Sequence, residues 1–200
     1  MTGAEQGSVA AARATPDLET YRRRVRELVT AARMGHIERV TETAVAIARA
    51  NGLDERLQHQ VELAAVLHDA ARDLPDDELV RLGAPADELE RRHPLTLHGR
   101  AARSLAATWG VTDEAVLGAI EGHVFGVPPT DAVGMCVYVA DVCEPGRGVN
   151  DDLRELAMHD LLAAYRRAVV TKVRYLEAAG KPVHPGTLAV YRRLFGEEAR

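Results

Sequence analysis

The sequence predicts an all-α protein that folds as a single helical bundle. The chain has 200 residues, 46% of them hydrophobic, which is enough for one buried core. It holds only two Phe, one Trp and five Tyr but abundant alanine, and small side chains favour closely packed helices over a sheet. Apolar residues also recur at helical spacing along most of the chain.

Capping residues and glycines divide the chain into successive helices. Typical helix starts occur at Thr15-Pro16, Thr112, Asn150 and Pro185. Typical helix ends occur at Asn51-Gly52, Gly83, Gly110 and Gly180. The expected helices therefore cover residues 16–29, 36–51, 57–72, 76–82, 95–109, 113–120, 131–142, 151–179 (broken near residue 159) and 185–194.

The most apolar run, residues 133–140, ends at Asp141 and could form a strand, because it is short and rich in valine. Helical neighbours on both sides favour a buried helix instead. Residues 1–15 are rich in Ala, Gly and Ser, so we expect a flexible N-terminus there. Residues 16–196 then form one domain.

Composition argues against several classes of function. The net charge of −5 disfavours binding to a nucleic acid polymer. No apolar stretch reaches the ~18–20 residues of a membrane span or forms a signal peptide, so we expect a cytoplasmic protein without a membrane partner. Cys136 and Cys143 are too far apart on a helix for a disulfide and are expected to be buried free thiols.

Four of the eight histidines and two aspartates fall at helix ends or on apolar helix faces: His36, His68, His98, His123, Asp69 and Asp141. One such histidine alone is most often a satisfied core residue. Several buried imidazoles together with buried carboxylates are costly unless they are paired or bind a cation. A mixed set of nitrogen and oxygen ligands suits Fe, Mn or Zn more than Ca or Mg.

The order of these residues resembles the signature of the HD-domain metal-dependent phosphohydrolases. Within them, the chain is most similar to the symmetrical bis(5'-nucleosyl)-tetraphosphatases, which hydrolyse diadenosine tetraphosphate. The resemblance extends over about residues 30 to 195. The segments that carry it are 64–73, 97–99, 119–123, 138–147, 153–157, 160–161 and 183–188.

The resemblance implies an HD-domain helical bundle with a dinuclear metal site. His36, His68, Asp69 and Asp141 would hold one metal ion, and Asp69 would bridge to a second ion held by His98 and His123. The two divalent ions would be iron, or alternatively manganese, cobalt or another transition metal. A metal-bridging hydroxide would attack the substrate, a small-molecule nucleotide, and release two ADP. Relatives also suggest a homodimer.

Three arginines are candidate phosphate contacts. Arg72 stands one turn after Asp69, where the family usually has lysine, and is a candidate catalytic and substrate-binding residue. The alternative for Arg72 is a solvated ion pair with Asp73 or Asp76. Arg147, on the Glu-Pro-Gly-Arg turn, and Arg39, one turn after His36, are candidate substrate-binding residues. The alternative for Arg147 is a solvent-exposed arginine on a loop.

The chain departs from the family pattern beside two of the candidate ligands. Val124 follows His123 where the family usually has threonine, and Arg100 stands where it tends to have proline. These changes leave hydrolysis of a mononucleotide open. Two separate alternatives are a di-iron oxygenase, because some HD proteins use the same ligand set with oxygen, and a nucleotide-binding module without catalysis. No role in catalysis is expected for the remaining histidines, which are His59, His93, His159 and His184. His184 is expected to cap the last helix, with a position near the cleft as the alternative.

Overall fold

The computed structural model describes residues 17–196, in which every regular element is a helix, and this confirms the all-α class. Residues 1–15, expected to be flexible, lie outside the described part. The elements in chain order are α1 (Leu18–Arg26), α2 (Ala31–Ala50), α3 (Glu55–Leu67), α4 (Asp76–Gly83), α5 (Glu88–Arg92), the 3-10 helix η1 (Pro94–Leu97), α6 (His98–Thr108), α7 (Glu114–Gly122), α8 (Ala132–Cys143), the 3-10 helix η2 (Pro145–Arg147), α9 (Asp151–Ala157), α10 (Leu161–Ala178) and α11 (Pro185–Phe195).

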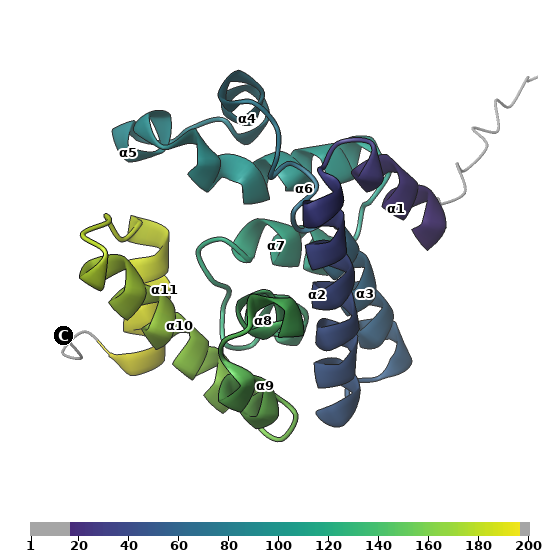
Figure 1. The fold of residues 1–200 in the computed structure, drawn as a ribbon, viewed down its shortest axis with the longest axis vertical. Coiled ribbons are helices and arrows are strands. Elements are labelled where there is room, and N and C mark those ends of the chain that lie inside the picture. The colour runs from purple at the N-terminus through teal and green to yellow at the C-terminus, as the bar shows by residue number, and fades with distance from the viewer. Residues whose placement is uncertain (1–16, 197–200) are drawn as a thin grey trace, which may run out of the picture.

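The centre of the bundle is α8, which forms from the apolar run whose alternative was a strand. It packs against α2, α3, α7, α9 and α10, and Figure 1 shows α8 between the α2–α3 pair and α10. Asp131 caps its N-terminus by accepting a hydrogen bond from the Gly134 amide at 2.8 Å. Since helices surround it, apolar residues on all its faces are buried, and both Cys136 and Cys143 are buried free thiols as predicted.

A second layer of helices, α4 to α7, lies across one end of this centre (Figure 1). In it, α6 packs against both α4 and α7, and α7 in turn packs against α3 and α8. Within residues 17–196, each helix falls short of the length and apolar character needed to cross a membrane.

Two predicted helix starts were wrong because aspartates cap these helices. α1 begins after Asp17, whose carboxylate accepts from the Thr20 amide at 2.7 Å, while Thr15-Pro16 lies outside the described residues. α7 begins after Asp113 and not after Thr112. Short carboxylates are among the strongest N-caps, so an aspartate competes well for this position.

The start of α2 and the C-terminal end of α3 also differ from prediction, and both differences affect where the functional residues lie. Thr30 caps α2, which therefore begins five residues before His36. α3 ends at Leu67, and a series of turns replaces the helix expected to continue to residue 72. His68 and Asp69 consequently lie at the end of a helix, where the chain changes direction.

The segment after α4 contains two further corrections. Gly83 is the last residue of α4, and Ala84 takes the left-handed conformation with a φ of 45°. Gly83 is needed for close packing, because a Cβ there would lie 2.8 Å from that of Leu97. α5 was not predicted, since five residues carry too little periodicity to identify a helix. The helix expected over 95–109 is divided into η1 and α6.

Candidate active site

Six side chains from five helices or their ends meet at the junction of the two layers: His36, His68, Asp69, His98, His123 and Asp141. Asp69 lies at their centre and is 3% exposed. Its Oδ2 atom lies 3.8 Å from His36 Nε2 and 3.7 Å from His68 Nε2. Its Oδ1 atom lies 3.4 Å from the Nε2 atoms of both His98 and His123. Each carboxylate oxygen therefore faces a different pair of imidazoles.

Three of the imidazoles are oriented in the same way, by the backbone of their own helical turn. The Nδ1 atoms of His68, His98 and His123 lie 2.6 to 2.7 Å from the carbonyl oxygen three residues earlier. A carbonyl oxygen only accepts, so Nδ1 carries the proton in each ring. In the neutral imidazole, the lone pair of Nε2 is then directed towards Asp69.

The residues therefore fit a metal ion, because several acceptor atoms face one another without a donor. The Nε2 atoms of His98 and His123 lie 3.0 Å apart, and neither carries a proton when its ring is neutral. Burial, followed by the neighbouring His123, lowers the pKa of His98 to about 3, so protonation does not resolve this contact near neutral pH. His68 Nε2 is buried and has no hydrogen-bond partner within residues 17–196.

Two groups of potential ligand atoms are close enough to share an ion. One contains His36, His68 and Asp141, and the other contains His68, Asp69 and His123. His98 adjoins the second group through its contacts with Asp69 and His123.

The fourth imidazole, that of His36, is oriented by a distant side chain. Its Nδ1 lies 3.0 Å from Oε1 of Glu144, while its Nε2 lies 3.0 Å from Oδ1 of Asp141. Burial alone would lower the pKa of His36, but the carboxylates of Asp141 and Glu144 outweigh this effect and raise the pKa. Arg39 donates to Glu144 at 2.7 Å, so its guanidinium lies behind His36 and does not line the cavity over the candidate ligands.

A glycine allows α6 and α7 to bring His98 and His123 together. A Cβ on Gly99 would lie 2.7 Å from the carbonyl oxygen of Glu121 and 2.7 Å from Cγ2 of Val124. The two helices could not approach this closely with a larger residue at position 99.

Cations surround the mouth of the site. A cavity of about 230 Å³ over the candidate ligands is lined by Arg33, Arg72, Arg147 and Lys172. Arg147 pairs with Asp141 at 2.6 Å, and Arg33 pairs with Asp69 at 2.9 Å. Arg33 was not among the residues predicted from the sequence. It lies one turn before His36 on the same helix face, and this spacing could have identified it as a residue of the site.

Arg72 lines the same cavity but forms no ion pair with a carboxylate in the part of the chain that the structure describes. Asp73, its alternative partner, instead lies 3.5 Å from Nε of Arg33 and accepts from the Thr30 amide at 2.9 Å. The Arg72 guanidinium is therefore available to an anion.

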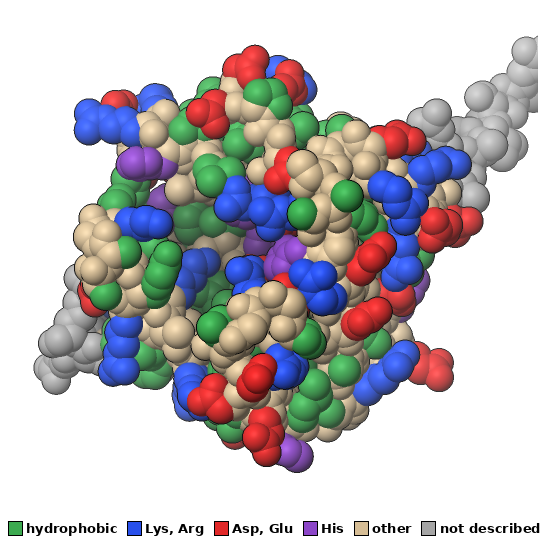
Figure 2. Space-filling view, viewed as in Figure 1, with side chains coloured by type: hydrophobic (Ala, Val, Ile, Leu, Met, Phe, Trp, Pro, Cys, Tyr) green, Lys and Arg blue, Asp and Glu red, His purple; other side chains and the backbone are tan. Residues whose placement is uncertain are grey.

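A larger cavity of about 500 Å³ adjoins the first one and has a mostly apolar wall. The two cavities share Arg72, His98, Val124 and Lys172. Figure 2 shows Lys and Arg side chains around a hollow in this face of the molecule, with histidine visible inside it. The larger cavity also includes His93, which was expected to have no role in catalysis.

One wall of the larger cavity is built on a buried carboxylate. Glu90 is 2% exposed, pairs with Arg100 and lies 3.1 Å from Nε2 of His184. His184 caps α11 as predicted and stacks on Phe125 with ring centroids 3.8 Å apart. Arg100, which departs from the family pattern, therefore supports this wall and does not contact the candidate ligands.

The chain is similar to known proteins over most of its length. Residues 33–146 match the model of the HD domain family. Over 181 residues the chain is 32% identical to a symmetrical bis(5'-nucleosyl)-tetraphosphatase from Halalkalibacterium halodurans, covering 87% of this chain and 95% of that protein. A protein of the same name from Staphylococcus aureus is 32% identical over 149 residues, covering 70% of this chain and 74% of that protein.

A solved structure has the same fold. It is the crystal structure of a predicted HD superfamily hydrolase involved in NAD metabolism from Clostridium acetobutylicum. The TM-score is 0.82 at 27% identity, and the match covers 92% of this chain and 100% of that one.

Proposed function

The chain belongs to the HD domain family, and on that premise we propose that it is a metal-dependent hydrolase that cleaves diadenosine tetraphosphate symmetrically into two ADP. The observation that carries this proposal is the central position of Asp69, each of whose oxygens faces two imidazole Nε2 atoms. The names of the two curated relatives support the same substrate and the same symmetrical cleavage.

The candidate ligands divide into two sets that share one carboxylate. His36, His68, Asp69 and Asp141 would hold one ion, and Asp69, His98 and His123 a second. Imidazole nitrogens with carboxylate oxygens suit first-row transition metals; we expect iron, with manganese or cobalt as alternatives. Two such ions would act as Lewis acids and supply a nucleophile from water near neutral pH.

The side chains around this centre perform three tasks. Glu144 fixes the orientation of His36, and carbonyl oxygens fix the other three imidazoles. Arg72, which forms no direct ion pair in the described chain, would bind a substrate phosphate and stabilise the negative charge that develops on it. Arg147 lies at the same mouth and would exchange Asp141 for a phosphate when substrate binds.

The arrangement also places an apolar cavity beside the candidate ligands. The candidate ligands are largely buried, and the adjoining apolar cavity of about 500 Å³ can receive the nucleoside part of a nucleotide. Arg39 is held by Glu144, so its candidate role in substrate binding would require it to leave that partner.

Product analysis tests the proposal. The protein is loaded with Fe(II) without oxygen, or with Mn(II), and incubated with diadenosine tetraphosphate before the nucleotides are separated by chromatography. ADP as the sole product supports symmetrical cleavage, whereas ATP with AMP, or no turnover, contradicts it. Faster release of phosphate from mononucleotides would favour a mononucleotide as the substrate. The apolar Val124 beside His123 is the reason for testing this alternative.

A further inference from the structure

Lys172 lies on α10 where the two cavities meet. It lines both the 230 Å³ cavity over the candidate metal ligands and the 500 Å³ apolar cavity beside it. A ligand that extends from one cavity into the other passes between Lys172 and the other residues that the two cavities share, Arg72, His98 and Val124.

The ammonium group of Lys172 is held in place by a carbonyl oxygen and an aromatic ring. It donates to the carbonyl oxygen of Val124 and lies 5.1 Å from the ring centroid of Tyr138. Within residues 17–196 it forms no direct ion pair with a carboxylate, and the charge of Asp141 acts on it only from a longer distance. Burial lowers its pKa to about 8, so the charged form is retained at neutral pH although it is costly. A bound anion would remove that cost.

The larger cavity has the chemistry of a site for an anion with an apolar part. Arg72, Lys172 and Lys181 line it, and none of the described residues that line it is an aspartate or a glutamate. Its remaining wall includes Leu89 and Phe125. The chain has 25 lysines and arginines but only two lysines, and both belong to this cavity.

We propose that Lys172 is a substrate-binding residue whose ammonium contacts the phosphate chain of the nucleotide where it passes from the metal centre into the apolar cavity. This assignment rests on the proposed function for the identity of the nucleotide. Arg72 and Lys172 would then contact the phosphate chain from α3's end and from α10, two elements far apart in sequence. The nucleoside would occupy the apolar cavity.

The test measures binding to the metal-loaded protein by calorimetry, with two probes, ADP and adenosine. Lys172→Met removes the charge and keeps a side chain of similar length. We expect it to weaken ADP binding by roughly 10- to 100-fold, the range for a hydrogen bond to a charged group. Adenosine binding should change less than about threefold, because adenosine carries no phosphate. Equal loss for both probes, or no loss for either, would overturn the assignment.

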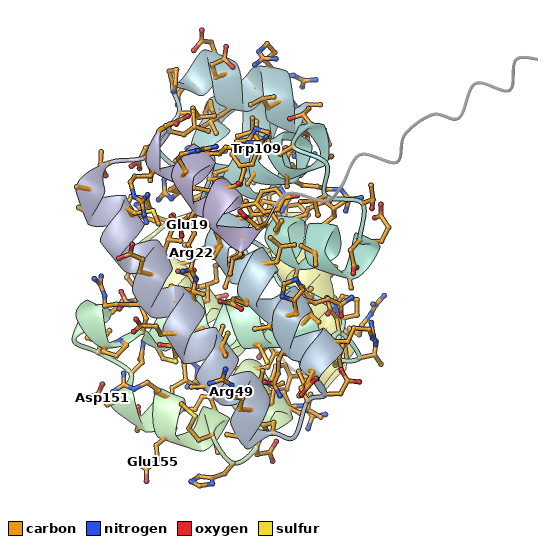
Figure 3. The ribbon with its side chains drawn as sticks, turned by 90° about the vertical axis from the view of Figure 1, so that its right-hand side faces the viewer. Glu19, Arg22, Arg49, Trp109, Asp151 and Glu155 are labelled. Atoms are coloured by element: carbon orange, nitrogen blue, oxygen red, sulfur yellow. The ribbon has the colours of Figure 1, made fainter. Side chains whose placement is uncertain are left out.

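Two further variants separate the contact from general effects. Arg49→Met removes one surface charge near the C-terminal end of α2 (labelled in Figure 3), and it should leave ADP affinity unchanged. Lys172→Arg keeps the charge and should retain most of the affinity. If Lys172→Met fails to fold, the affinity of Lys172→Gln is measured instead. An Arg49→Met variant as weak as Lys172→Met would contradict a local contact.

The results for substrate and for Lys172 can be told apart. Wild-type protein that fails to cleave diadenosine tetraphosphate, but binds ADP through Lys172, refutes the proposed substrate and supports the residue. Symmetrical cleavage by wild type, with ADP binding indifferent to Lys172→Met, supports the function and overturns the role of Lys172.

Discussion

Replacing Gly99 by alanine tests whether close contact between α6 and α7 is needed for the second set of ligands. The added Cβ would lie 2.7 Å from the Glu121 carbonyl oxygen and from Val124 Cγ2, about 0.7 Å inside the 3.4 Å at which ordinary contact begins. Val124 could rotate, but the carbonyl oxygen belongs to the backbone of α7. Relief therefore requires α7 to move, and His123 moves with it.

The expected cost of Gly99→Ala is that of an overpacked interior, about 1–3 kcal/mol of unfolding free energy. In a chain of this size, each kcal/mol lowers Tm by about 2–4 °C. Because His98 and His123 would separate, we also expect the bound metal to fall from two ions per chain to one. Thermal unfolding of metal-free protein and elemental analysis of loaded protein measure the two effects.

Gly118→Ala is the matched control, because Gly118 lies in α7 and a Cβ there would meet no atom within 4 Å. Alanine should stabilise this helix by about 0.5–1 kcal/mol and leave two ions bound. A Gly99→Ala variant with two ions and the Tm of the Gly118→Ala variant would refute the reasoning.

Four further predictions concern the candidate ligands and their support. Asp69→Asn should lose both metal ions and turnover, since each oxygen serves a different set of imidazoles; two bound ions and full activity would contradict this. Glu144→Gln should weaken metal affinity by roughly 10- to 100-fold by releasing His36, as a titration with Mn(II) would show; unchanged affinity would exclude this support. Burial raises the pKa of Glu144, but hydrogen bonds from Arg39 and His36 outweigh this effect and lower the pKa from 4.5 to about 2. The folding stability of the metal-free wild type should therefore fall as the pH is lowered from 4.5 to about 2. The Glu144→Gln variant should lose less stability over that pH range. Acid-unfolding curves of the same shape for wild type and variant would contradict the lowered pKa of Glu144. Chelation should lower the Tm of the loaded protein and added metal should restore it; an indifferent Tm would argue against bound metal.

The sequence was sufficient to predict the helices that carry the candidate ligands. The buried helix at residues 132–143 was predicted from its helical neighbours, because its own valine-rich pattern also allowed a strand. The six candidate ligands could be chosen because buried polar residues in apolar segments need a reason. The structure brings all six together, and their role as ligands stays a prediction.

What could not be predicted depends on contacts between distant parts of the chain. Arg33 approaches Asp69 only because α2 lies beside the turn after α3. Lys172 donates to the carbonyl oxygen of Val124, which lies 48 positions earlier in the sequence. The sequence pattern of α10 does not predict that contact. Helix boundaries also moved, because Thr30 and Asp113 compete for caps that sequence assigns only approximately.

The two ways in which the imidazoles are oriented have a consequence for how the centre assembles. His68, His98 and His123 are aligned by a carbonyl within their own turn, so each acquires its orientation as soon as its helix end forms. His36 acquires its orientation only when Glu144, 108 positions later, packs against α2. His36 is therefore aligned only after α2 and the residue that follows α8 have packed together. The other three histidines are local units that could be transferred to another helical scaffold as short segments.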